Sequence, residues 1–266
     1  MIKRIIAAVV ALCAMTAPVL ADSPFDPILL ITSKPAAWWD ASYAPSITLS
    51  GSNVTAWADR SGNGTTLTQG TGALQPTYTT NCQNGLSCLT LSSQYMTKTG
   101  SALATGSSAS TIFTVAGQVS VASRCVISYG TNATGQVRQV CSNPGGLFYS
   151  DIGGTIASAG ANWSGVSLGF AYFTNTNIYA SVNGSTPGTT ATGALNTVTN
   201  NITMGGFSQA WIGTIEEVIV YNTVFTQAQR QLIEGALAWK WGIQSNLAAG
   251  HPYKTIPPSF ANSLFF

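Results

Sequence analysis

The sequence contains few charged residues. Only 7% of its 266 residues are Asp, Glu, Lys or Arg, and His251 is the single histidine. Glycine, serine, threonine and asparagine are abundant instead, so the polar groups on offer are mainly hydroxyls and amides. This composition is typical of a secreted or surface-displayed β protein and argues against a cytosolic enzyme.

A hydrophobic run long enough to cross a membrane comfortably is also missing, because a spanning helix needs about 20 apolar residues. The apolar run at residues 5–17 follows Lys3 and Arg4 and precedes the small-residue pattern Val19-Leu20-Ala21. This order predicts a secretory signal over residues 1–21. We therefore expect an extracellular, periplasmic or cell-surface protein that is not inserted in a membrane after the signal is cleaved.

Cleavage of the predicted signal would leave the remaining chain without net charge. The loss of Lys3 and Arg4 from ten basic residues leaves eight, which equals the eight acidic residues. A protein without a net electrostatic field has no driving force toward nucleic acid or anionic lipid. Both are therefore excluded as expected partners.

The rest of the chain contains nothing that resembles a linker or a repeat of fixed period, so we expect one domain. Residues 22–36 are punctuated by prolines and are predicted to form an extended lead-in, and residues 37–258 are assigned to the domain. Residues 259–266 end in Leu264-Phe265-Phe266. This apolar tail predicts either a last strand on the domain or a docking segment through which copies of the chain associate.

Four cysteines remain after signal cleavage, because Cys13 belongs to the signal. An even number in an oxidising compartment favours disulfides. Three pairings are open, and the simplest joins Cys82 to Cys88 and Cys125 to Cys141, since each couple flanks a turn-forming segment. Free or metal-binding thiols are the alternative.

One helix is predicted near the C-terminus. Thr226 stands three residues before Gln229, which is the spacing of a capping box. Apolar residues then recur at steps of three and four up to Trp241, and Gly242 supplies a stop. The β-branched run before the helix, residues 213–221, predicts a strand.

The middle of the chain predicts more strands, at residues 111–119, 124–129, 166–173 and 177–182. Turn signals separate them, among them Asn183-Gly184 and Asn143-Pro-Gly-Gly146. Short strands at this spacing predict a sandwich of two antiparallel sheets. The expected fold class is therefore all-β.

Two stretches resemble a known family. Residues 37–95 contain, in order, WDAS, a tryptophan two residues before an aspartate, SGNG, a glutamine and QPTY, and residues 205–258 contain GTIEEVIVYN, QLIEGALAWKWG and HPYK. Together they are similar to the LamG-like, concanavalin A-like jelly-roll proteins of bacteria and their phages. The resemblance implies a two-sheet jelly-roll sandwich with a C-terminal helix packed on it, and this fold hosts many activities.

Catalysis is not expected. Glycan-cleaving relatives of this fold use a Glu-x-Asp-x-x-Glu strand motif that places two carboxylates in one cleft, and this chain lacks it. Glu216 and Glu217 are adjacent on a predicted strand, so their side chains are expected on opposite faces. An enzyme assembled from distant residues, for example Asp151 with one of these glutamates, stays an alternative.

Asp59 and Asn63 form a candidate calcium site. They offer a carboxylate and an amide oxygen across a tight Ser-Gly turn, and calcium prefers hard oxygen ligands. The alternative is an Asx turn in which Asp59 accepts hydrogen bonds from nearby backbone amides and no metal binds. No other cofactor is implied.

Three aromatic residues are candidates for stacking on a ligand. Trp163 lies in a turn-like segment between strands, and Tyr129 and Tyr149 lie on or beside the expected cysteine-linked hairpin. The leading hypothesis is a secreted, non-catalytic, lectin-like protein whose partner is a glycan or a surface component. The alternatives are a structural subunit of a bacterial surface or phage virion, and a glycan-cleaving enzyme.

Overall fold

The structure, a computed structural model, describes residues 26, 30–119, 122–143, 146–192, 195–199, 201–206 and 209–259. The predicted signal at residues 1–21 and the predicted tail beyond Ser259 lie outside these residues. In the part of the chain that is described, no helix has the length and apolar character needed to cross a bilayer.

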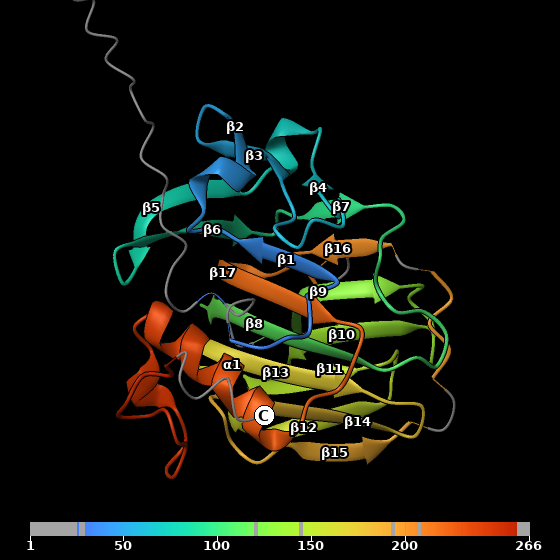
Figure 1. The fold of residues 1–266 in the computed structure, drawn as a ribbon. Helices are drawn as coiled ribbons and strands as arrows, with labels where there is room; N and C mark the ends of the chain where they lie inside the picture. The colour runs from blue at the N-terminus through green and yellow to red at the C-terminus, as the bar shows by residue number, and fades with distance from the viewer. Residues whose placement is uncertain are drawn as a thin grey trace, which may run out of the picture.

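The fold is all-β with one long helix, and its strands form two layers that face each other (Figure 1). The helix-side layer contains β1 (Ala37–Asp40), β5 (Thr77–Gln83), β6 (Leu86–Ser92), β8 (Ser110–Gln118), β13 (Gly165–Phe173), β14 (Asn177–Val182), β15 (Gly188–Ala191) and β17 (Ile212–Tyr221). The groove-side layer, named for hollows on its outer face, contains β4 (Leu67–Thr68), β7 (Met96–Lys98), β9 (Arg124–Gly130), β10 (Val137–Ser142), β11 (Leu147–Asp151), β12 (Ile156–Asn162) and β16 (Ile202–Met204).

The two layers are parts of one connected sheet. The hairpin of β2 (Ile47–Ser50) and β3 (Asn53–Trp57) pairs with β4 in one layer and β5 in the other. All 17 strands of the described chain therefore belong to a single hydrogen-bonded network of antiparallel pairs. The strands predicted at residues 124–129, 166–173, 177–182 and 213–221 are confirmed as β9, β13, β14 and β17.

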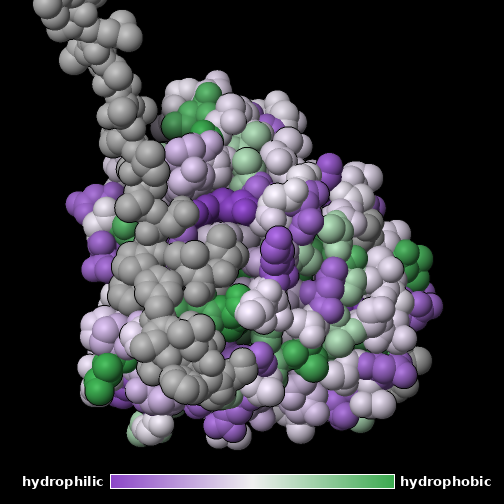
Figure 2. Space-filling model, viewed as in Figure 1, coloured by the Kyte–Doolittle hydropathy of each residue, from purple (hydrophilic) through white to green (hydrophobic). Residues whose placement is uncertain are grey.

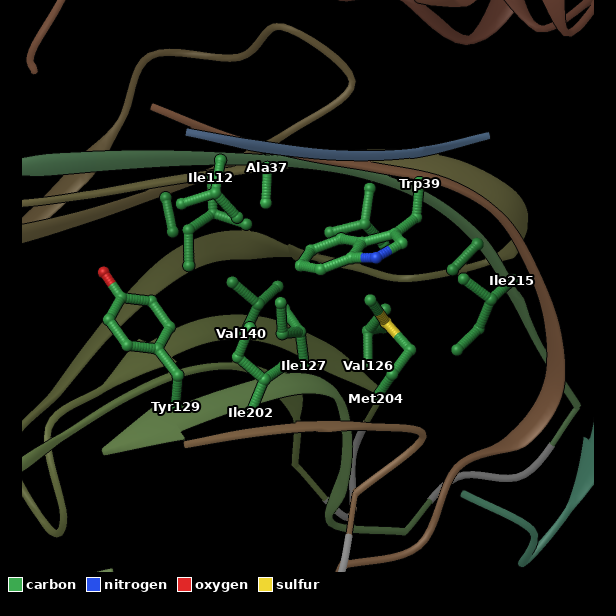
Figure 3. Close-up of a cluster of buried hydrophobic side chains, with 14 of the residues drawn as sticks. Ala37, Trp39, Ile112, Val126, Ile127, Tyr129, Val140, Ile202, Met204 and Ile215 are labelled. Atoms are coloured by element: carbon green, nitrogen blue, oxygen red, sulfur yellow. The ribbon is translucent and has the colours of Figure 1, made fainter. Parts of the chain in front are cut away.

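The main hydrophobic core lies between the layers. Figure 3 shows Trp39 and Ile112 of the helix-side layer pointing toward Val140 and Ile202 of the groove-side layer. Strand residues alternate between core and outer face, so every second side chain in these strands is available for the surface. Hydrophobic residues on the face seen in Figure 2 form separate patches among hydrophilic ones.

Helix α1 (Gln227–Lys240) begins and ends as the sequence predicts. Thr226 and Gln229 form both hydrogen bonds of the capping box, and Gly242, just after the helix, has a positive φ of 67°. The hairpin between β5 and β6 caps the C-terminal end of α1. The Gln83 side chain donates a hydrogen bond to the Trp241 carbonyl at 2.9 Å, and the Asn84 side chain donates one to the Lys240 carbonyl at 2.9 Å. These bonds satisfy carbonyls that a helix end leaves without partners.

A buried ion cluster joins α1 to the helix-side layer. The Lys240 Nζ lies 2.8 Å from Asp40 Oδ2 and 2.7 Å from Glu217 Oε2. Glu217 also accepts hydrogen bonds from the indole nitrogens of Trp38 and Trp241, both at 2.7 Å. The carboxylates hold the pKa of Lys240 above its usual value despite burial, so the lysine stays charged and fixes the helix end on β1 and β17.

Arg60 extends this cluster. Its terminal nitrogens lie 2.6 Å from Asp40 Oδ2 and 3.1 Å from Asp26 Oδ2. The guanidinium lies over the rings of Trp38 and Tyr43, 3.9 and 4.2 Å from their centroids. The segment after β3, the lead-in around Asp26 and strand β1 are therefore held by one cation.

The sequence-based placement of the two adjacent glutamates is wrong. A β-bulge in β17 makes Glu216 an extra residue against β8. Ile215 points into the core, whereas Glu216 accepts a hydrogen bond from Thr214 Oγ1 at 2.6 Å and Glu217 contacts the helix end. Both glutamates therefore lie on the helix side, because a bulge interrupts strand alternation.

Glu216 is a buried acid without an ionic partner among the described residues. Its side chain is inaccessible, and Oε2 has no hydrogen-bond partner. Burial raises the pKa of Glu216 to about 8, against hydrogen bonds that lower it. The side chain is therefore mainly protonated at neutral pH.

Replacing Lys240 by Met should destabilise the fold by about 3–5 kcal/mol, because Asp40 and Glu217 would stay buried without their shared cation. Urea unfolding measures this loss. Lys98→Met on β7 is the control, since the described residues give Lys98 no salt bridge, and we expect a change within about 0.5 kcal/mol. Equal losses in the two variants would contradict the role given to Lys240.

Glu216 should make the protein less stable as pH rises. The unfolded chain releases this proton near pH 4.5 and the folded chain near pH 8, so between these values folding retains a proton and stability falls by up to about 1.4 kcal/mol per pH unit. Glu216→Gln should make the free energy of unfolding depend less steeply on pH, by the contribution of about one proton. Urea unfolding from pH 5 to 8 measures it, and an unchanged slope would contradict the assignment.

Candidate functional site

A row of polar side chains crosses the groove-side layer at right angles to its strands. Residues directly opposite each other on paired strands point to the same face. The register places on one row Thr68, Thr97, Thr203, Ser128, Gln139 and Asp151, from β4, β7, β16, β9, β10 and β11. We call this the hydroxyl-amide row.

The row lies on the outer face of the layer. Thr203 stands between Ile202 and Met204, which both point into the core. Ser128 and Gln139 likewise have core residues beside them in their strands. Strand alternation therefore directs the polar side chains away from the core.

Two adjoining hollows lie over this row. One, of about 410 Å³, is lined by Cys125, Ser128, Gly130, Asn132, Val137, Gln139, Thr203, Gly206 and Gln209. The other, of about 350 Å³, is lined by Asn132, Ala133, Thr134, Gln139, Asp151, Gly153, Gly154 and Gln209. Because Asn132, Gln139 and Gln209 line both hollows, we treat them as one groove.

The central side chains of the groove have unused hydrogen-bonding capacity. Ser128, Thr203 and Gln139 are half-buried, and no residue of the described chain hydrogen-bonds to their side chains. A hydroxyl donates one hydrogen bond and accepts two, and an amide donates and accepts two each. The groove therefore offers several neutral donors and acceptors to a ligand.

Asp151 is the acid that lines the groove. Its Oδ1 accepts a hydrogen bond from the Gly154 amide at 2.7 Å. Burial raises the pKa of Asp151, while the amides of Gly154, Gly153 and Ile152 oppose the rise. One carboxyl group at the end of a neutral row can bind a hydroxyl but has no second acid beside it in the groove lining.

The pair suggested as an alternative catalytic site is separated by the whole sandwich. Asp151 opens onto the outer face of the groove-side layer, whereas Glu217 contacts Trp38 and Lys240 beneath the helix. Acid and nucleophile of a glycosidase must flank one bond. Asp151 and the adjacent glutamates therefore cannot act together.

With this geometry in place, the chain can be compared with known proteins. No family model and no curated protein matches it. An arabinofuranosidase complexed with arabinofuranosyl-alpha-1,2-xylobiose has a similar fold, with a TM-score of 0.55, 14% identity, and coverage of 71% of this chain and 51% of that one. The likeness is one of fold. A mutant GH54 α-L-arabinofuranosidase, soaked with 4-nitrophenyl α-L-arabinofuranoside, has a TM-score of 0.55 at 16% identity and the same coverage.

A smaller structure is covered almost completely. Domain 4 of AbnA, a GH43 extracellular arabinanase from Geobacillus stearothermophilus in complex with arabinotriose, has a TM-score of 0.52 at 13% identity. The match covers 77% of this chain and 98% of that one. The chain spans about half the length of the arabinofuranosidases, so the described β-sandwich corresponds to a part of those enzymes.

The structure corrects the expected exposure of Trp163. The side chain is 4% exposed and packs against Phe148 and Trp211, with ring centroids 5.0 and 5.3 Å away. Its indole nitrogen donates to the Ala116 carbonyl at 2.7 Å. Trp163 is therefore a core residue, although the sequence around it is turn-like, and its ring is not accessible to a ligand.

Tyr129 and Tyr149 are buried as well, which corrects the same expectation. The Tyr129 hydroxyl donates to Ser110 Oγ at 2.9 Å, and the buried Arg138 guanidinium lies 5.7 Å from its ring. Tyr149 packs beside the disulfide of Cys125 and Cys141. Both rings therefore support the groove-side layer rather than form a platform.

Both disulfides have the local pairing that the sequence favoured, Cys82 with Cys88 and Cys125 with Cys141. Cys125 and Cys141 are directly opposite each other on β9 and β10. Cys125 also lines the groove, so this disulfide fixes two strands that carry the hydroxyl-amide row.

Asp59 and Asn63 do not fit a calcium ion. Both carboxylate oxygens of Asp59 already accept hydrogen bonds, Oδ1 from the amides of Trp38 and Ser61 and Oδ2 from the Ser61 hydroxyl and the Thr65 amide. The Asn63 amide nitrogen donates to carbonyl oxygens of the lead-in. Donors surround the carboxylate where other oxygens would be needed, so the Asx-turn alternative describes the hydrogen bonding.

Apart from the disulfide residue Cys125 and Asp151, considered as an alternative catalytic acid, the residues of the groove are not among those that the sequence analysis singles out. Gln139 and Ser128 occupy alternate polar positions in apolar strands, and this alternation is a signal that they face outward. The alternation does not say which strands are neighbours. The row depends on pairing between strands far apart in the sequence.

Chelation should leave stability unchanged if Asp59 forms an Asx turn. We expect the same melting temperature with added calcium and with EDTA, measured by circular dichroism. Asp59→Asn, which removes the charge that accepts these hydrogen bonds, should destabilise the fold by about 1–3 kcal/mol in either condition. A melting temperature that rises with calcium in the natural protein and not in Asp59→Asn would restore the calcium site.

Proposed function

We propose that this protein is a secreted, non-catalytic glycan-binding protein that uses the groove on its groove-side layer. The observation that carries the proposal is the hydroxyl-amide row, a line of neutral donors and acceptors across neighbouring strands. Sugars present hydroxyl groups, each of which donates and accepts hydrogen bonds. Unpaired side chains such as those of Ser128, Thr203 and Gln139 can match them.

The shape of the groove supports a chain-like ligand. Successive members of the row are about 4.8 Å apart, the distance between neighbouring strands. Its two hollows adjoin through Gln139. A short oligosaccharide that crosses the strands can therefore meet one polar side chain after another.

The proposal includes the finer fold assignment, a LamG-like, two-sheet jelly roll, which rests on the sequence motifs of residues 37–95 and 205–258. The similar fold of an arabinanase domain whose structure contains arabinotriose makes arabino-oligosaccharides the first ligands to test. Export is supported by the two disulfides and by the predicted signal.

The binding is proposed to be non-catalytic because the groove holds one carboxyl group. General acid and base, or acid and nucleophile, require two groups on either side of the scissile bond. Asp151 can orient a sugar hydroxyl, but Glu216 and Glu217 lie on the helix side of the sandwich, away from the groove.

A glycan array that includes arabinotriose, followed by calorimetric titration of the ligands that bind, tests this function. Gln139→Ala should weaken binding about tenfold, the effect of roughly 1.4 kcal/mol. Thr203→Val should weaken it about two- to tenfold, because it removes one hydroxyl at nearly constant shape.

The matched control is Thr90→Val. Thr90 is an exposed threonine of β6 on the outer face of the other layer, and its replacement should leave affinity unchanged. Absence of binding to any glycan, or equal losses in Thr90→Val and Thr203→Val, would reject the groove. Release of reducing ends over time would reject the non-catalytic assignment.

A further inference from the structure

A second candidate site lies on the opposite face of the sandwich. Aromatic rings follow one another there across neighbouring strands: Phe113 and Phe170 are 5.2 Å apart, Phe170 and Tyr172 5.5 Å, and Tyr172 and Tyr179 3.9 Å. Phe113 and Phe170 are buried at the helix, whereas the two tyrosines are half-buried. The row therefore runs from the core to the surface.

The last two rings lie face to face at the outer side of the sheet. Tyr172 and Tyr179 are directly opposite each other on β13 and β14, and their planes are within 11° of parallel. Each stands between residues that point into the core, so both rings face outward. The Tyr179 ring therefore holds the Tyr172 ring in place from one side.

Beside the tyrosines is a hollow of about 180 Å³. It is lined by Phe170, Tyr172, Pro187, Phe225, Gln227 and Arg230. Ligand pockets for drug-sized molecules have about 300–1,000 Å³, so this hollow suits one ring rather than a chain. Half of these residues are aromatic, and the others supply a proline ring, one amide and one guanidinium group.

Arg230 provides the charge of this hollow. Its Nε is fully buried, has no hydrogen-bond partner and lies 3.6 Å from Glu234 Oε2. The guanidinium lies 5.2 Å from the Phe170 ring centre. In the described chain no residue accepts a hydrogen bond from its two terminal nitrogens. They keep the donor pair that binds a carboxylate in a bidentate manner.

We propose that this hollow binds one carboxylated sugar ring, a uronate, with its C–H face on Tyr172 and its carboxylate on the terminal nitrogens of Arg230. A neutral sugar could stack on Tyr172 but would leave those two nitrogens without an acceptor. The hollow and the groove lie on opposite layers, so this site does not depend on the proposed function of the groove. With both sites, one protein could bind a neutral and an acidic glycan segment at once.

Calorimetric titration with methyl glucuronide and methyl glucoside tests the site, because the two probes differ in the carboxylate. We expect glucuronide to bind at least about tenfold more tightly, because only its carboxylate can form a charge-assisted, bidentate pair with Arg230. Tyr172→Ala should weaken glucuronide binding about tenfold, since it removes the ring that lines the hollow. Equal affinity for the two probes would overturn the proposal.

Arg230→Lys tests the paired donors, because lysine keeps the charge toward Glu234 and loses the planar fork. We expect it to lose the preference for glucuronide, with a melting curve recorded to confirm folding. If this variant does not fold, Tyr172→Ala and the probe pair still decide. Thr90→Val is the control and should bind glucuronide as the natural protein does.

Two further probes distinguish the uronate site from a general carboxylate site and from the groove. Benzoate is a planar carboxylate without sugar hydroxyls, and benzoate binding as tight as glucuronide binding would overturn the sugar assignment. Saturating arabinotriose should leave glucuronide affinity unchanged. Competition between them would place both ligands in one site and overturn a separate hollow, whereas failure of arabinotriose alone would affect only the groove.

Discussion

The contact of Lys240 with Asp40 and Glu217 is the interaction on which the arrangement of the protein depends. A charged amine withdrawn from water must meet its carboxylates closely, because each ion loses several kcal/mol of hydration. Strand β1 lies far in sequence from β17 and the end of α1, and the three segments can satisfy this requirement in one relative position. Arg60 then brings the segment after β3 and the lead-in to the same cluster. The helix is thereby fixed over one layer, and the opposite layer keeps an uncovered outer face.

Burial of the acids leaves the outer faces of the protein with few carboxylates. Of the seven acidic residues that the structure describes, six are buried, namely Asp26, Asp40, Asp151, Glu216, Glu217 and Glu234. The few carboxylates thus serve the interior, and the outer faces present hydroxyls, amides and aromatic rings. Such surfaces bind by shape and hydrogen bonds rather than by long-range attraction. The two proposed sites, the neutral groove and the aromatic hollow with Arg230, lie on opposite layers.

The aromatic residues that the sequence pattern assigned to a ligand are also buried, and packing explains why. Trp163 is found in the core because Ala116 in β8 accepts its indole hydrogen bond and two neighbouring rings pack around it. The aromatic pair that does reach the surface, Tyr172 and Tyr179, lies within strands whose sequence reads as ordinary β structure. Exposure of a ring depends on where α1 stops covering the sheet, which is a property of packing.

The local features of this protein follow from its sequence alone: the capping box of Thr226 and Gln229, the stop at Gly242, most strand positions, the local disulfides and the low charge of the surface. Each of these depends on residues close together in the chain or on composition. Long-range packing sets the register that aligns Thr203, Ser128 and Gln139, the bulge that puts Glu216 and Glu217 on one side, and the meeting of Lys240 with Asp40. These features require strands far apart in sequence to pair, and a shift of one residue would turn every side chain of a strand to the other face.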